Sequence, residues 1–218
     1  MQTSYKTVYA GGTGEIIEKK SRFIATVIPI KSEEEALSFI EQMKKKNWDA
    51  SHNCSAYVLG LNQELQRCSD DGEPSKTAGR PMLDILLGEG IHNTAVVVTR
   101  YFGGTLLGTG GLVRAYQSAA KEGLANSIII EKHFGKQYEI TTDYNGIGKL
   151  QYIAGTMNLT ILSTDYTDIV KAILLIPPDA LGAFQKKMTE ATNGRAIMEE
   201  LEDVYYAFLD EKILIENA

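Results

Sequence analysis

The sequence lacks any apolar run near the length of about 20 residues that a bilayer-spanning helix needs. Its opening residues, MQTSYKTVYAGG, also lack the apolar core of a secretory signal. We therefore expect no membrane association and a cytoplasmic location.

Cysteine and histidine are also scarce in this sequence. The two cysteines, Cys54 and Cys68, could form a disulfide, but two reduced thiols are the favoured interpretation because no secretion signal is present. The three histidines, His52, His92 and His133, lie far apart and do not have metal-ligand spacing. We expect neither a metal site nor a cofactor.

The length of 218 residues and the hydrophobic fraction of 44% allow one large domain or two small ones. The net charge of −6 is unevenly distributed. Residues 1–133 contain 15 Lys/Arg and 15 Asp/Glu, whereas residues 134–218 contain 7 and 13. Because an acidic module gains nothing from phosphate counterion release, contact with nucleic acid is expected from a local patch of the first part.

The most distinctive stretch follows the apolar run 95–98, which is typical of a buried central strand. Small and apolar residues then recur at helical spacing from Leu112 to Ala120. Arg100 precedes the intervening loop and Arg114 follows it. The loop holds five glycines: Gly103, Gly104, Gly108, Gly110 and Gly111.

This order of strand, glycine loop and helix has two interpretations. Glycines before a helix N-terminus, with arginines on either side, could form an anion site. Alternatively, the glycines supply positive φ angles for a tight crossover, and the alanines allow close packing of the helix. The spacing matches neither the P-loop nor the G-x-G-x-x-G dinucleotide pattern.

A second unusual loop carries the carboxylates Asp70, Asp71 and Glu73 together with Lys76 and Arg80. Three acids so close could bind a hard cation or form a solvated turn. We favour an interaction surface, because loops on rigid scaffolds often carry function.

The two loops together suggest one site. We hypothesise that Lys76, Arg80, Arg100 and Arg114 face a common cleft that binds phosphate through bidentate arginine contacts. Gly103, Gly104, Gly110 and Gly111 would then complete an anion-, RNA- or partner-binding site.

The remaining patterns predict an α+β protein of two domains, 1–132 and 133–218. In the first domain we expect strands within 15–30, 53–60 and 65–69, and helices at 35–46, after a capping box at Ser32 and Glu35, and at 82–87. In the second, we expect strands near 137–142, 159–163, 169–176 and 196–206. Two helices lie between them, one capped by Asp143 and the other ended by Asn193 and Gly194. That order, βαββαβ, is the ferredoxin-like motif.

The sequence resembles the IMPACT/YigZ family over most of residues 5–130. Three blocks carry the resemblance, in the order SHNCSAY (51–57), SDDGEP with AGRP (69–74 and 78–81), and RYFGG running to RAY (100–104 and 114–116). The resemblance implies that the first domain has the fold of the second domain of small-subunit ribosomal protein five. The second domain is similar to domain V of elongation factor G. Eukaryotic relatives act as translational regulators by binding a partner of a starvation-responsive kinase, and the resemblance assigns no catalytic residue.

We therefore expect a cytoplasmic, non-enzymatic binding protein linked to translation or its regulation. Its first domain would contact RNA or a ribosome-associated protein. The alternative is a phosphate- or nucleotide-binding enzyme that uses the glycine loop 103–111, since some small-molecule kinases share the expected fold. No nucleophile with a paired base can be identified in the sequence, which favours binding over catalysis.

Overall fold

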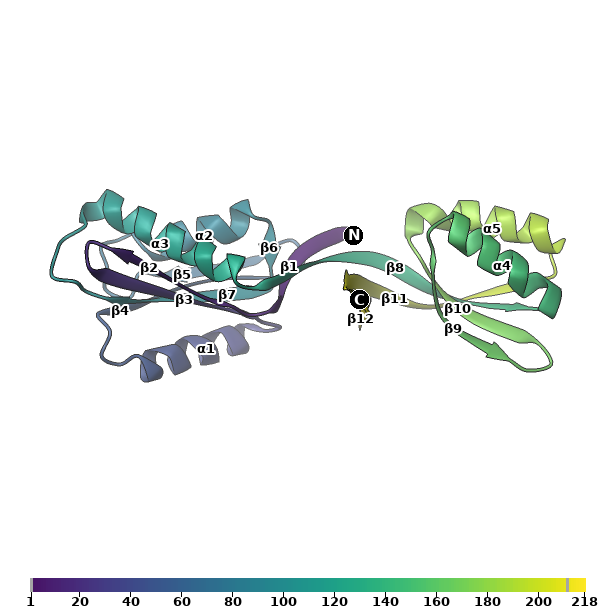
Figure 1. Cartoon of the computed structure of the whole chain (residues 1–218), viewed down its shortest axis with the longest axis horizontal. Helices are drawn as coiled ribbons and strands as arrows, with labels where there is room; N and C mark the ends of the chain where they lie inside the picture. The colour runs from purple at the N-terminus through teal and green to yellow at the C-terminus, as the bar shows by residue number, and fades with distance from the viewer. Residues whose placement is uncertain (1, 211) are drawn as a thin grey trace. The chain divides into compact units, whose positions relative to one another are not determined.

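The computed structural model describes residues 2–210 and 212–218 and divides the chain into two compact units (Figure 1). They are Met1–Glu131 and Lys132–Ala218. Both combine helices with an antiparallel sheet, so the α+β prediction is confirmed. No helix in the described part of the chain is long and apolar enough to cross a membrane.

A five-stranded antiparallel sheet forms the centre of the first unit. Its strands, in spatial order, are β2 (Thr13–Glu18), β3 (Ser21–Pro29), β7 (Thr94–Tyr101), β4 (His52–Leu59) and β5 (Leu65–Ser69). The central strand β7 contains the apolar run 95–98, as predicted, and is buried along almost its whole length.

Helices cover both faces of this sheet (Figure 1). On one face, Ala95 and Val97 pack in the cluster of α1 (Glu33–Lys46). On the other, Val96 and Val98 pack beneath α2 (Gly79–Gly88) and α3 (Gly108–Ala125). Burial on both faces explains why β7 is continuously apolar rather than alternating.

Capping fixes where the first two helices begin. The predicted Ser32 cap is present in α1, because Ser32 Oγ accepts from the Glu35 amide, while the Glu35 carboxylate accepts from the amide of Lys31, one residue before the cap. Helix α2 begins at Gly79, three residues before the predicted start, because the Asp70 carboxylate accepts from the amide of that glycine.

The second unit has the predicted ferredoxin-like order of elements. These are β8 (Ile128–Thr142), α4 (Tyr144–Thr156), β9 (Thr160–Tyr166), β10 (Val170–Ile176), α5 (Pro178–Thr192) and β11 (Ile197–Leu209), followed by β12 (Lys212–Asn217). The strands pair antiparallel in the spatial order β9-β10-β8-β11-β12. Strand β12 extends the motif and was not predicted.

Strand β8 differs from the prediction in its length. The sequence predicted a strand only near 137–142, after a link between the domains at 131–136, whereas one strand begins in the first unit and continues into the second. Residues 133–136 pair with Tyr206 to Asp203 of β11, so this tertiary pairing extends the strand through the expected link. Two further elements were missed: β1 (Ser4–Ala10) pairs in parallel with the short β6 (Ile91–His92).

Candidate functional site

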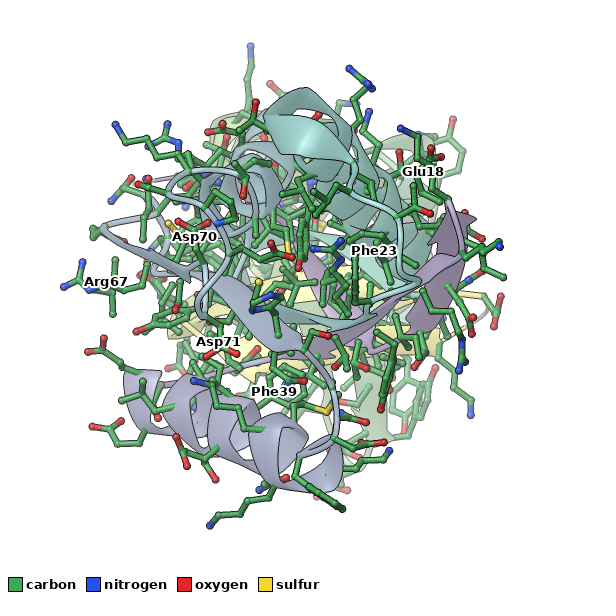
Figure 2. The ribbon with its side chains drawn as sticks, turned by 90° about the vertical axis from the view of Figure 1, so that its left-hand side faces the viewer. Glu18, Phe23, Phe39, Arg67, Asp70 and Asp71 are labelled. Carbon is green, nitrogen blue, oxygen red and sulfur yellow. The ribbon has the colours of Figure 1, made fainter. Side chains whose placement is uncertain are left out.

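One end of the first unit's sheet brings together the two loops singled out in the sequence (Figure 2). Strand β7 ends there beside the start of β3, where Arg22 is opposite Tyr101, and beside the start of β4, where His52 is opposite Arg100. Strand β5 ends at the same side, since Ser69 pairs with Ser55 near the start of β4. We call this the loop end of the first unit.

The loop after β5, residues 70–78, is held by its own carboxylates, and we call it the acidic loop. Asp70 Oδ1 accepts from the amides of Ala78 (3.0 Å) and Gly79 (2.8 Å), while Asp70 Oδ2 accepts from the Lys76 amide (2.8 Å). Asp70 therefore caps α2 instead of facing a partner.

The second carboxylate joins the acidic loop to α1 and β4. Asp71 Oδ2 accepts from the Asn53 amide at 2.7 Å, and Asp71 Oδ1 lies 2.7 Å from Lys44 Nζ. Partial burial opposes ionisation, but the Lys44 ammonium and the Asn53 amide outweigh it and hold the pKa of Asp71 below its usual range.

The third carboxylate, Glu73, is buried in an ion pair. Arg100 Nη1 lies 2.5 Å from Glu73 Oε1, and both side chains are more than nine-tenths buried. The hydroxyl of Tyr116 on α3 donates to the same oxygen at 2.8 Å. The rings of Phe23 and Phe102 lie 5.3 and 5.5 Å from the Arg100 guanidinium carbon, so cation–π contacts add to the pair.

The Cys54 thiol completes this buried cluster. Its Sγ lies 2.9 Å from the Asp70 carbonyl oxygen and 3.3 Å from the Tyr116 hydroxyl. Burial raises the pKa of Cys54 and of Tyr116 far above their ordinary values. Both groups therefore stay protonated, and neither is an activated nucleophile.

The glycine-rich stretch is partly loop and partly helix. Helix α3 starts at Gly108, so Gly110 and Gly111 lie in its first turn and not in a loop before it. Gly103 packs on the turn between β2 and β3, where a side chain would fall 2.1 Å from the Lys20 carbonyl carbon. Gly104 has a φ of +81°, which favours glycine. Close approach and backbone conformation thus explain two of the predicted glycines.

Arg100 does not share an exposed cleft with the other three predicted cations. Arg100 is buried against Glu73, and Arg80 pairs with Asp84 at 2.7 Å on the surface of α2. Lys76 is exposed and contributes its amide to Asp70. Arg114 is exposed, and its guanidinium lies 3.6 Å from the position that a side chain of Gly110 would take. The hypothesis therefore needs correction at Arg100, because a buried guanidinium with a bound carboxylate cannot clamp an outside phosphate.

The sequence indicated a bend at Lys19, Lys20 and Ser21 between two possible strands, but not that this basic turn lies beside the glycine loop. Lys19 and Lys20 form the β2–β3 turn, are exposed, and have positive φ angles of 46° and 67°. The Gly103 amide donates to Ser21 Oγ at 3.1 Å, which holds the loop against this turn. Only the pairing of β3 with β7 reveals this proximity, because about 80 residues separate the two segments in the sequence.

The described residues contain no group of three or more His, Cys, Asp or Glu side chains that could hold a metal ion. The three carboxylates of the acidic loop bind backbone amides, Lys44 and Arg100 instead.

Comparisons with known proteins match each unit to a family. Residues 19–124 match the Impact N-terminal domain, and residues 140–195 match a domain of unknown function, DUF1949. The chain is 40% identical over 205 residues to the IMPACT family member YvyE of Bacillus subtilis, with 94% of each chain covered. It is 35% identical over 178 residues to YigZ of Escherichia coli, covering 81% of this chain and 87% of the relative.

Two further matches agree with this family assignment. Mouse Protein IMPACT is 30% identical over 141 residues, which cover 62% of this chain and 42% of that protein. A solved structure described as "Crystal structure of an hypothetical protein" aligns with a TM-score of 0.59 and 32% identity, covering 93% of this chain and 99% of the other. The chain belongs to the IMPACT family.

Proposed function

We propose that this IMPACT family member is a cytoplasmic, non-enzymatic binding protein linked to translation or its regulation. We propose further that it contacts RNA or a ribosome-associated protein through the loop end of the first unit. The observation that carries the proposal is the group of exposed cations Lys19, Lys20 and Arg114 on both sides of the glycine loop.

These three cations are free to meet a partner. Within residues 2–210 and 212–218, none of them has an acidic partner within ion-pair distance, whereas Arg22 pairs with Glu15 at 2.8 Å. The first turn of α3 contains no acidic residue, and its cap forms no side-chain hydrogen bond. Its amides and the helix dipole therefore add to the positive potential around Arg114.

The positive charge of these three side chains is opposite in sign to the net charge of the chain, which is −6. A concentration of unpaired cations on an acidic protein is expected where an anionic partner binds. The buried cluster supports binding over catalysis, because the Cys54 thiol and the Tyr116 hydroxyl are both held protonated.

The test uses purified ribosomal particles and the full chain. The wild type should co-sediment with the particles, and the triple variant Lys19→Ala, Lys20→Ala, Arg114→Ala should not. Each phosphate contact that is lost should flatten the salt dependence of binding by about one unit of slope. Lys121→Ala is the matched control, because this exposed lysine lies farther along the same helix.

The outcomes separate the possible functions. Equal binding by wild type and triple variant would show that the cations have no part in recognition. If the wild type does not bind the particles and a discrete nucleotide copurifies with it, the enzyme alternative replaces the proposal.

A further inference from the structure

Two aromatic side chains stand exposed at the loop end. Trp48, which follows α1, is 83% exposed, and Phe102, which follows β7, is 48% exposed. Leu106 in the glycine loop is 82% exposed, and no other large hydrophobic side chain in the described chain exceeds 73%. Exposed apolar side chains that gather at one end of a unit, unlike those scattered singly, are typical of a contact surface.

Hydrogen bonds fix the two segments that carry these rings against each other. The Ser51 amide donates to the Arg100 carbonyl at 2.9 Å, and the Phe102 amide donates to Ser51 Oγ at 3.4 Å. The Tyr101 hydroxyl donates to Asp49 Oδ1 at 3.3 Å, one residue after Trp48. The segment 47–51 is therefore anchored to the end of β7, so the loop that carries the Trp48 ring is held in place.

Cations lie on both sides of the aromatic pair. Lys45 and Lys46, exposed at the end of α1, immediately precede Trp48 in the chain. On the other side, Gly103 follows Phe102 and packs on the turn that carries Lys19 and Lys20. The strands that lead to these segments, β3, β7 and β4, are adjacent, and two strand spacings of about 10 Å separate β3 from β4.

We propose that the loop end binds single-stranded RNA, with phosphates on the lysines and unpaired bases stacked on Trp48 and Phe102. This inference rests on the proposed function and specifies its partner. Alternating aromatic and cationic groups suit a single strand because its bases are free to stack, whereas the bases of a duplex are already stacked on each other. A protein partner is the competing outcome of the test.

The single tryptophan supplies the first measurement. Because Trp48 is the only tryptophan of the chain, its fluorescence reports directly on a base that stacks against it. We expect oligouridine to quench it, and a hairpin of equal length with a short loop to bind at least 10-fold more weakly. Binding of labelled RNA is followed in parallel by anisotropy.

Variants then test the rings. Trp48→Ala should weaken binding of oligouridine about 10-fold, in the range found when a stacking aromatic is removed. Phe102→Leu should act in the same direction while keeping an apolar cover over Arg100. Tyr152→Ala is the matched control, since that ring is 73% exposed on α4 of the second unit. Melting curves confirm that each variant is folded.

The results distinguish this inference from the proposed function. If hairpin and oligouridine bind equally and the aromatic variants bind as the wild type does, the contact is with phosphate alone and the single-strand inference fails. If the chain binds ribosomal particles but no free RNA, the partner is a protein, which overturns this inference and leaves the proposed function standing. If it binds neither, both are wrong.

Discussion

Replacing Glu73 by glutamine should strongly destabilise the first unit. The substitution preserves shape and removes the one carboxylate that lies against the Arg100 guanidinium. Arg100 is 5% exposed, and its Nε already has no hydrogen-bond partner among the described residues. The variant therefore leaves a buried positive charge without compensation.

The magnitude follows from the contacts that remain. Breaking one partner of a buried ion pair typically costs about 3–5 kcal/mol. Glutamine still offers Tyr116 an acceptor, and the rings of Phe23 and Phe102 still stabilise the cation. We therefore expect the lower end of that range, about 3 kcal/mol, against a total stability of about 5–15 kcal/mol for a typical domain.

Urea unfolding followed by circular dichroism measures the loss, and hydrogen exchange of β7 and α3 assigns it to the first unit. The control is Asp84→Asn, which breaks the exposed pair with Arg80 and should cost less than about 1 kcal/mol. Combining Glu73→Gln with Arg100→Met should recover part of the loss, because the uncompensated charge is then gone. A loss below about 1 kcal/mol for Glu73→Gln alone would refute this reasoning.

Further predictions concern the thiols, the acidic loop and the two units. Alkylation of native protein should modify Cys68 alone, and alkylation after denaturation without reductant should also modify Cys54, as mass spectrometry can show. The folded pKa of Asp71 is lowered, so its stabilising effect should be complete above about pH 4, the unfolded value, and disappear as the pH falls through the folded one. The melting-temperature advantage over Asp71→Asn should shrink accordingly. Chelator should not change the melting temperature, because the carboxylates of the acidic loop are already paired; a shift of several degrees would contradict this. Fragments 1–131 and 132–218 should each unfold cooperatively by circular dichroism; if both are insoluble, the division into independently folding domains is wrong.

Local signals predicted much of the fold. The Ser32 cap of α1, the Asp143 cap of α4 and the left-handed Asn193 after α5 act within a few residues, so each could be located in the sequence. The continuity of β8 could not be predicted, because residues 133–136 become strand only through pairing with β11. Strand β6 could not be predicted either, because a strand of two residues paired with β1 is too short to show a periodic pattern.

The site was harder to predict than the fold because charge type does not reveal burial. Arg100 and Arg114 looked equivalent, being basic residues on either side of the glycines. Strand alternation places Arg100 on the same face as Val96 and Val98, beneath α3, where it needs an internal anion. The carboxylates of the acidic loop pair with backbone amides, Lys44 and Arg100 inside the first unit. The sequence alone does not distinguish this role from that of an exposed interaction surface.

The buried cluster and the exposed surface are parts of one arrangement. Phe102 lies over the Arg100 guanidinium, and the Glu73 carboxylate pairs with that group while accepting a hydrogen bond from the Tyr116 hydroxyl. The position of an exposed ring at the loop end therefore depends on an ion pair beneath it. If the proposed RNA binding is correct, the acidic loop contributes to it indirectly, because its buried Glu73 fixes Arg100, the residue against which Phe102 is placed. A Glu73→Gln variant that stays folded at low temperature should for this reason weaken RNA binding without changing its salt dependence, since none of the cations at the surface has been removed.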